Sequence, residues 1–261
     1  MKEMNLKQGL EYHYRVFDRS KIEPDPLQFL HMFSDPKDIE AIGFMSSVFA
    51  YGNVKQIINT MNRMLDITGN SPYQFILHFN IKKDSKRFDK LKHRFYSTAD
   101  IVRLFELLKE AYQNFSSLNN LFLFSFNNDE LNVKGGITGF SKFFIETYKA
   151  KFGEPTRGIT FMFPDPEKGS ACKRMNLFLR WMVRKDELDF GIWSGILTCQ
   201  LIIPVDTHIA SICKRLRLTT RNNVSWQMAE EITNNLKKYD LTDPVKYDFA
   251  LCHIGMRKLK L

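Results

Sequence analysis

Apolar residues recur every three or four positions through the first half of the chain, which is the spacing of one face of an α-helix. Helix starts are indicated at Asp25-Pro26 and Asp35-Pro36, because proline suits the first helical turn and an aspartate can cap it. We therefore expect helices in these stretches: two between Asp25 and Gly52, one from Val54 to about Ile67, one from Ser97 through Tyr112, and one from Ile137 to Phe152.

The second half follows a loop-like segment. Residues 153–168 are rich in glycine and proline, which favour turns. The most apolar run, from Gly191 to Val205, is shorter than the roughly 20 residues that span a bilayer, so we interpret it as buried core. The expected fold class is all-α, in one large domain or two lobes. Residues 1–168 form its helical first region and residues 169–261 carry the candidate chemistry.

The chain is basic, and its basic residues are unevenly distributed. Lys and Arg number 38 against 29 Asp and Glu, a net charge of +9. Such a charge suits a polyanionic partner, although a soluble protein can also be basic without one. Residues 82–94 hold seven Lys or Arg against two aspartates. This run could contact phosphate or could be a solvated surface.

The cysteines give no sign of a metal centre. Cys172, Cys199, Cys213 and Cys252 lack the paired spacing of zinc or iron–sulfur sites, so we expect reduced thiols and neither a metal nor a cofactor. The first 15 residues contain no apolar stretch like that of a secretory signal peptide. These features predict a cytoplasmic protein with no membrane association.

A first candidate for chemistry is Lys173. It follows the small residues Gly-Ser-Ala-Cys at positions 169–172 and opens an amphipathic helical pattern over residues 174–183. A lysine in the first helical turn lies at the positive end of the helix dipole, which lowers the cost of losing its proton. A neutral amine is the nucleophilic form. Lys173 is therefore either an activated nucleophile or an ordinary surface lysine.

A second candidate is Asp206, at the end of the apolar run. Ile209 and Ile212 give the next helix its inner face, so Asp206 stands at the N-cap position. Backbone N–H groups there favour the ionised carboxylate, which would suit a developing positive charge on a sugar. The same residue could simply cap the helix. His208 has no partner at metal-ligand spacing, so we interpret it as structural or as a phosphate contact.

Together the two candidates carry a resemblance to a known family. The sequence Pro-Val-Asp-Thr-His-Ile at residues 204–209 closely resembles the Val-Asp-Thr-His block of the helix-hairpin-helix DNA glycosylases. Residues 169–173 are similar to the hairpin and lysine that precede this block, and residues 249–255 to the last helix of the catalytic lobe. The resemblance covers about residues 169–257. It implies a two-lobed helical bundle with a helix-hairpin-helix element.

By this resemblance Lys173 is the nucleophile, and Asp206 the assisting carboxylate, of a DNA glycosylase with AP-lyase activity. The implied partner is double-stranded DNA with a damaged base flipped from the stack, bound by a monomer that is cytoplasmic and associated with the nucleoid. No cofactor is implied. The candidate DNA contacts are Gly169, Ser170, Arg174, Arg180, Arg184 and His208. The three arginines of this set equally fit a solvated helix face.

Departures from the family pattern leave an alternative open. The family hairpin reads Gly-x-Gly-x-Lys, whereas this chain has Gly-Ser-Ala-Cys-Lys, so its backbone is expected to grip phosphate less well or differently. Asp206 follows Lys173 by 33 positions (206 − 173), a wide spacing similar to that of the archaeal 8-oxoguanine glycosylase branch. That branch implies an oxidised purine as substrate. The chain is also similar to an uncharacterised bacterial family distantly related to these glycosylases. The alternative is a non-catalytic protein that binds DNA or RNA on the same fold.

The wall of a pocket for a flipped base needs a flat aromatic side chain. The candidates, each more often a core residue, are Trp181, Phe190, Trp193 and Trp226.

Overall fold

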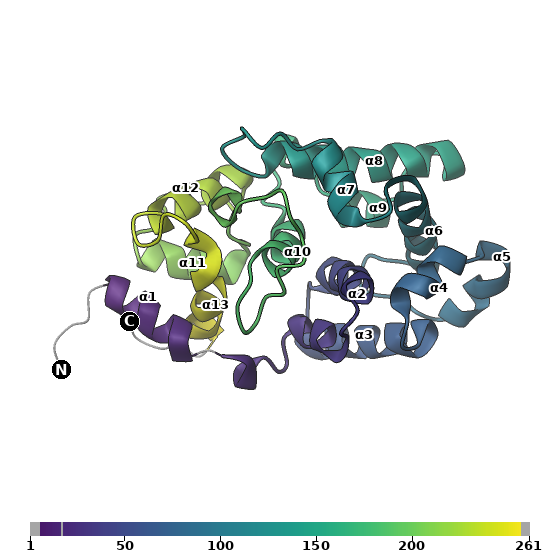
Figure 1. The fold of residues 1–261 in the computed structure, drawn as a ribbon, viewed down its shortest axis with the longest axis horizontal. Coiled ribbons are helices and arrows are strands. Elements are labelled where there is room, and N and C mark those ends of the chain that lie inside the picture. Colours follow the sequence, from purple (N-terminus) through teal and green to yellow (C-terminus); the bar gives the residue numbers. More distant parts are fainter. Residues whose placement is uncertain (1–5, 17, 257–261) are drawn as a thin grey trace. The chain divides into compact units, whose positions relative to one another are not determined.

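The computed structural model describes residues 6–16 and 18–256, and the regular structure of these residues is helical (Figure 1). Their antiparallel pairings are limited to isolated bridges, His93 with Tyr96 and Lys185 with Phe190. The prediction of an all-α fold class is confirmed. Residues 1–5, part of the segment compared with a signal peptide, lie outside the described residues, as does residue 257 at the end of the family resemblance.

The chain divides into two compact units. The terminal unit combines Met1–Glu23, Asn128–Lys134 and Pro166–Leu261, and the central unit combines Pro24–Asn127 and Gly135–Asp165. The helices of the terminal unit are α1 (Leu6–Val16), η1 (Arg19–Lys21), η4 (Pro166–Lys168), α10 (Lys173–Val183), η5 (Thr198–Gln200), α11 (Thr207–Arg215), α12 (Trp226–Leu236), η6 (Pro244–Tyr247) and α13 (Asp248–Met256), where η marks a 3₁₀ helix. Those of the central unit are η2 (Pro26–Met32), α2 (Pro36–Phe49), α3 (Val54–Thr68), α4 (Pro72–His78), α5 (Ile81–Asp84), η3 (Ser85–Phe88), α6 (Thr98–Phe115), α7 (Leu118–Phe124), all but the first residue of α8 (Lys134–Phe152), and α9 (Arg157–Met162).

This division differs from the two regions expected from the sequence. The boundary near residue 168 is close to the start of the last segment at Pro166, but α1 belongs to the terminal unit. The Tyr247 hydroxyl donates to the Glu11 carboxylate, and the Tyr14 hydroxyl donates to Asp186 at 3.1 Å. These contacts join residues far apart in the chain, so a local pattern could not reveal them.

Capping side chains start the helices of the central unit as predicted. Asp25 accepts a hydrogen bond from a backbone N–H of η2, and Asp35 does the same for α2. Ser97 and Asp100 cap α6 reciprocally, each side chain accepting from the other residue's N–H. One expectation is wrong: the segment over residues 153–168 contains the short helix α9 as well as turns.

Aromatic side chains fill the core of the central unit. Every residue of α2 from Ile39 to Phe49 is buried, so neighbouring elements cover this helix on all sides. The ring of Phe44 lies 5.7 Å from Phe140 and 6.0 Å from Phe144, centre to centre. Phe144 in turn stacks on Phe163 at 4.4 Å. These rings hold α2 and α8 together.

In the terminal unit, residues 184–206 fold back onto α10. The N–H groups of Phe190 and Trp193 donate to the carbonyls of Trp181 and Met182, at 2.9 and 2.8 Å. Every residue from Leu201 to Val205 is buried, as predicted for this apolar run. The run is not wholly buried, since Leu197 is exposed.

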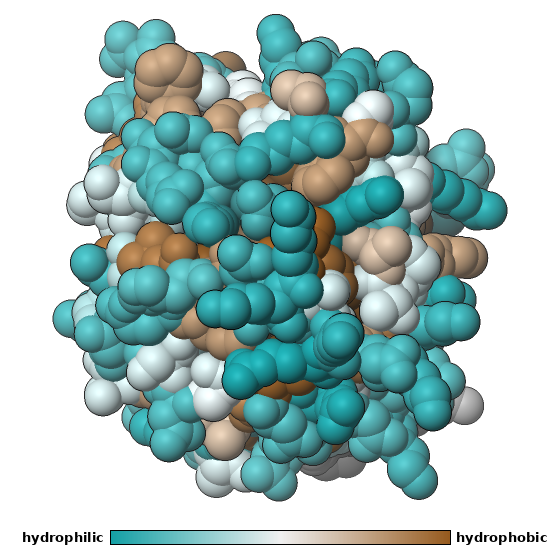
Figure 2. All heavy atoms as spheres, turned by 90° about the vertical axis from the view of Figure 1, so that its right-hand side faces the viewer, coloured by the Kyte–Doolittle hydropathy of each residue, from teal (hydrophilic) through white to brown (hydrophobic). Residues whose placement is uncertain are grey.

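Over the described residues, no helix combines the length and the apolar character needed to cross a bilayer. Hydrophilic side chains cover most of the face shown in Figure 2, and hydrophobic ones appear in smaller groups between them. Leu131 and Phe124 are highly exposed hydrophobic residues, and they belong to different units.

Candidate functional site

A tight turn over residues 169–172 places Lys173 at the first position of α10. Cys172 has a φ of +47°, a left-handed conformation that is uncommon for a residue with a side chain. Its carbonyl accepts from the Asn176 N–H at 2.9 Å. The Asn176 side-chain amide also donates to the carbonyl of Ala171 at 3.1 Å. The first turn of α10 therefore fixes the turn that precedes it.

Two predicted DNA contacts lie in the same turn. Gly169 has a φ of +82°, and its carbonyl accepts from the N–H of Trp226 at 3.1 Å, which joins the turn to the start of α12. The Ser170 hydroxyl accepts from the Cys172 N–H at 3.2 Å. Both residues are half-buried, and these polar groups hold the turn in place.

Asp206 is the N-cap of α11, as predicted. One carboxylate oxygen, Oδ1, accepts from the N–H groups of His208 and Ile209 at 2.9 and 3.0 Å. This capping fixes the side-chain orientation and leaves Oδ2 for another partner. Because the cap and the second contact use different oxygens, Asp206 can hold α11 and act on a neighbouring group at the same time.

That neighbouring group is Lys173. Its Nζ lies 2.9 Å from Asp206 Oδ2, and the two side chains expose 32% and 30% of their surface. The structure therefore brings together the two residues that the sequence identified, at hydrogen-bond distance and within reach of solvent. The turn before α10 and the cap of α11 fix this geometry from both sides.

The charge state of the pair differs from the expectation. Burial lowers the pKa of the Lys173 ammonium, but the charge of Asp206 and the hydrogen bond that Lys173 donates to it outweigh burial and raise that pKa above its usual value. Burial likewise raises the pKa of Asp206, but Lys173 and the capping N–H groups lower it below its usual value. The free protein thus holds an ammonium and a carboxylate, so the expectation that the helix start favours neutral Lys173 is wrong for this state.

A third ionisable group, Asp248, acts on the pair. It begins α13, is 4% exposed, and accepts a hydrogen bond from the Arg180 guanidinium. Burial raises the pKa of Asp248 to about 6, although the charges of Arg180 and Lys173 oppose the shift. In return, the charge of Asp248 contributes to the raised pKa of Lys173.

Two arginines that were predicted to contact phosphate are paired with carboxylates inside the protein. Arg180 and Arg184 are each 3% exposed, so they neither contact DNA nor form a solvated helix face, and both interpretations are corrected. Arg180 pairs with Asp189 at 3.2 Å and with Asp248. Their helix position allowed a surface role, but aspartates from the following segment and from residues 243 and 248 pair with them.

Arg184 pairs with more of these aspartates than Arg180 does. Its guanidinium contacts Asp243 at 2.9 Å and Asp186 at 2.9 Å, and it also pairs with Asp189. Asp189 is itself 3% exposed, and burial raises its pKa despite both arginines. This network ties α10 to the folded-back segment and to the residues before α13.

The two remaining predicted contacts differ in exposure. Arg174 is buried, at 8% exposure, whereas His208 is exposed on the first turn of α11. His208 therefore presents its ring to solvent, two residues after Asp206 in the chain. Of the proposed set of DNA contacts, His208 is the most accessible side chain.

The aromatic candidates for a base-stacking wall lie mainly in the core. Trp181, Trp193 and Trp226 are 1%, 6% and 1% exposed, and Trp193 meets Phe178 edge to face at 5.0 Å. Phe190 is half-buried. The tryptophans therefore stabilise the terminal unit.

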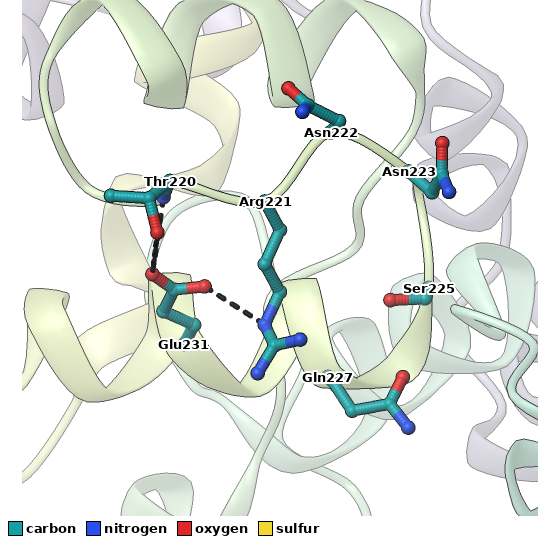
Figure 3. A pocket seen from close by; sticks show the side chains of 7 residues that line it. All are labelled: Thr220, Arg221, Asn222, Asn223, Ser225, Gln227 and Glu231. Atoms are coloured by element: carbon teal, nitrogen blue, oxygen red, sulfur yellow. Dashed lines mark hydrogen bonds and ion pairs between the residues drawn. The ribbon is translucent and has the colours of Figure 1, made fainter.

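An open hollow of about 660 Å³ lies on the surface of the terminal unit (Figure 3). The loop after α11 and the start of α12 line it, and Arg221 pairs with Glu231 at 3.0 Å on its wall. Ser225 also lines it, and the following residue, Trp226, is hydrogen-bonded to Gly169. Neither Lys173 nor Asp206 lines this hollow.

No group of three or more His, Cys, Asp or Glu side chains among the described residues is arranged to hold a metal ion. The four cysteines are free thiols, with Cys172 and Cys213 buried. Cys252 contributes to the electrostatic environment of Lys173.

Sequence reasoning missed Asp189 and Asp248. Asp189 lies in the long stretch between Lys173 and Asp206, and Asp248 begins the last helix. A buried arginine needs a compensating charge, so two arginines on the inner side of an amphipathic helix were the available signal. The pattern did not indicate which aspartates would provide that charge.

Comparison with known proteins yields a family but no characterised relative. Neither the curated proteins nor the solved structures include a match to this chain. A family model, described as "Protein of unknown function (DUF2400)", matches residues 25–257, which span both units. The chain therefore belongs to the DUF2400 family.

Proposed function

We propose that this chain is a base-excision DNA glycosylase with AP-lyase activity, in which Lys173 is the nucleophile and Asp206 assists it. The observation that carries the proposal is the 2.9 Å contact between Lys173 Nζ and Asp206 Oδ2. The two residues start two different helices and expose about a third of their side chains, so a substrate can reach both. The resemblance of residues 204–209 to the glycosylase block supports the same assignment.

In this mechanism the neutral amine of Lys173 attacks C1′ of the damaged nucleotide. The glycosidic bond breaks, and the base leaves with the bonding electrons and takes up a proton. The ring oxygen of the sugar is then protonated as its bond to C1′ breaks, which leaves an imine between Nζ and C1′. Loss of a proton from C2′ expels the 3′ phosphate and cleaves the strand. Asp206 accepts the lysine proton and stabilises positive charge at C1′.

The resting ion pair sets the order of events. In the free protein Asp206 raises the pKa of Lys173, so the proton stays on the amine. A sugar inserted between Nζ and Oδ2 would separate the pair and leave burial as the dominant influence, which lowers the pKa of Lys173. We therefore place proton loss after the nucleotide has entered the site.

We propose an oxidised purine, 8-oxoguanine, as the excised base, on the basis of the 33-residue spacing between Lys173 and Asp206 (206 − 173). The partner would be a DNA duplex whose damaged base is flipped into the protein. The net charge of +9 favours such a polyanion. A monomer associated with the nucleoid would suffice for this activity.

Borohydride trapping tests the proposal, because reduction of the imine leaves a covalent protein–DNA adduct. With a duplex that contains 8-oxoguanine, the wild-type protein should form the adduct and Lys173→Gln should form none. Asp206→Asn should slow adduct formation by about 100-fold or more, the usual contribution of a proton-transfer group. Lys185→Gln is the matched control, since Lys185 is an exposed lysine of the same unit.

The second candidate function is nucleic-acid binding without catalysis. The raised pKa of Lys173 favours it, because an ammonium can contact phosphate but cannot attack C1′. The replacement of the second hairpin glycine by Ala171 points the same way. Binding without adduct formation across oxidised, alkylated and deaminated bases would select this second function over the first.

A further inference from the structure

Phe95 occupies an unusual position in the central unit. It is 45% exposed, at the tip of a two-residue turn formed with Arg94. The flanking residues His93 and Tyr96 close the turn by exchanging backbone hydrogen bonds of 3.1 and 2.9 Å. Arg94 has a φ of +52°, in the region that favours glycine. An exposed aromatic side chain is thus held on a turn whose backbone is conformationally costly.

The turn is anchored to the body of the unit. The His93 imidazole lies between the Thr60 hydroxyl, at 2.9 Å, and the Tyr51 carbonyl, at 3.2 Å. The Tyr51 hydroxyl donates to the His93 carbonyl at 2.8 Å. Gly52 leaves room for Arg94, because a Cβ there would lie 2.7 Å from the Arg94 side chain. Phe95 and Arg94 are therefore presented in a defined geometry.

Cations and rings surround Phe95. The guanidinium carbons of Arg157 and Arg94 lie 4.9 and 5.6 Å from the centre of the Phe95 ring. The Tyr51 ring lies nearly parallel to Phe95 at 6.2 Å, and Phe161, itself 38% exposed, meets it edge to face at 5.6 Å. We call these five residues the Phe95 cluster. All belong to the central unit.

The charge of the Phe95 cluster is not neutralised internally. Arg94 and Arg157 are exposed, and neither forms an ion pair with a carboxylate of the described residues. Asp100 lies beside the cluster, but it is 3% exposed and accepts hydrogen bonds from Ser97 and Thr156. This is the reverse of Arg180 and Arg184, which are themselves buried and paired with aspartates.

We propose that the Phe95 cluster binds an unpaired stretch of nucleic acid, with a base stacked on Phe95 and phosphates held by Arg94 and Arg157. Aromatic faces bind bases irrespective of sequence, and guanidinium groups match the geometry of phosphate. Lys90 and Lys92 are exposed on the same segment and extend the positive surface. The basic run over residues 82–94 thereby acquires a defined role at its end.

The combination of ring and charge favours a nucleic acid over an acidic protein. Carboxylates alone would use the arginines but leave the exposed part of Phe95 in water. Each nucleotide of a strand carries a flat base and a phosphate. The base can stack on the aromatic ring while the phosphate contacts the arginines, so a nucleic acid uses both parts of the cluster. The cluster does not depend on catalysis by Lys173, so it can be tested separately.

The test is binding of the full chain to a fluorescein-labelled oligothymidylate of about 12 nucleotides, measured by anisotropy at several salt concentrations. Phe95→Ala should weaken binding by about 5-fold or more, the usual effect of losing one stacked base. Arg157→Ala should also weaken binding and reduce the salt slope by about 0.7. The matched controls Phe124→Ala and Arg63→Ala, exposed residues of the same unit, should bind like the wild type.

Competitors identify the bound chemistry. Oligouridylate should displace the probe as well as oligothymidylate does, or better if 2′-hydroxyls are contacted, whereas duplex DNA should compete less well. Inorganic polyphosphate should lose affinity for Arg157→Ala but not for Phe95→Ala. Unchanged binding in both cluster variants, equal losses in the controls, or displacement by polyglutamate as effective as by oligothymidylate would overturn the proposal. The assay measures binding alone and involves no covalent adduct, so failure of the glycosylase proposal leaves this result unaffected.

Discussion

The cations at the two ends of α10 differ in exposure and in the number of their carboxylate partners. At the first position, Lys173 has one carboxylate partner and exposes about a third of its side chain. At the far end, Arg180 and Arg184 each expose 4% of their side chains. Four carboxylates compensate these two charges, namely Asp186, Asp189, Asp243 and Asp248.

The difference shows that a cation's role depends on how many partners it has and how deeply they are buried. Removing one member of a buried network leaves a charge without solvent or partner, so such a network resists change. A single, partly open pair costs little to separate, so a ligand can insert between its members. One helix thus carries a fixed structural cluster and a pair that can be opened by substrate.

The largest effect should come from the buried end. Arg184→Ala should lower the free energy of unfolding by about 3–5 kcal/mol, because it removes a partner of the buried Asp189 and of the half-buried Asp186 and Asp243. Urea unfolding followed by tryptophan fluorescence measures this directly, since Trp181, Trp193 and Trp226 all lie in the terminal unit. Arg215→Ala, at an exposed position of the same unit, should change stability by less than about 0.5 kcal/mol. If the two variants were equally stable, the paired Arg184 would contribute no more to stability than an exposed arginine, and the far end of α10 would not be a fixed structural cluster.

The two ends should also respond oppositely to pH. The pKa of Asp248 is raised to about 6, so between about pH 4 and 6 the folded protein binds this proton more tightly than the unfolded chain. The stability contributed by Asp248 should therefore fall as the pH rises through this window. The pKa of Asp206 is lowered, so its contribution should be lost only as the pH falls below about 4.

Asp248→Asn isolates this effect. The unfolding free energy of the wild type minus that of the variant should decrease by on the order of 2 kcal/mol between pH 4 and 7. Urea titrations at several pH values provide the measurement. Parallel pH profiles for the two proteins would show that Asp248 ionises normally in the folded state.

The smallest effect on stability is expected at the open pair. Asp206→Ala should cost about 1 kcal/mol through loss of the α11 cap, whereas Asp206→Asn keeps a capping oxygen and should cost a few tenths. Both should lower the pKa of Lys173, because burial remains and the carboxylate charge is gone. NMR of ¹³C-methylated lysine follows that pKa. An unchanged value in Asp206→Asn would mean that the contact does not control the lysine proton.

Local sequence signals were sufficient for the four longest helices of the described residues, α2, α3, α6 and α8. Capping residues such as Asp35 and Ser97 act within one turn, so the helix starts they mark in the central unit were predictable. The short helix α9 was missed because its glycine- and proline-rich surroundings read as a loop. The placement of α1 was missed because its contacts are with Tyr247 and Asp186, distant in the chain.

The candidate site shows the same limit. The N-cap position of Asp206 and the helix-start position of Lys173 were read correctly, since each is a local property. The raised pKa of Lys173 was not predicted, because the direction of the pKa shift depends on the charge of Asp206 across a 2.9 Å contact. Likewise, Arg180 could not be separated from a surface arginine until Asp189 and Asp248 were placed against it.

The sequence by itself determined the all-α class and the helix starts, because periodicity and capping act over a few residues. The two residues on which the proposed chemistry rests came from the resemblance of residues 169–173 and 204–209 to a known family. Only the tertiary structure decided which cations are buried and paired, and which remain exposed beside Phe95. The reason is physical: burial and charge compensation depend on residues brought together from distant parts of the chain, and their energies depend on distance in space and not on separation in sequence.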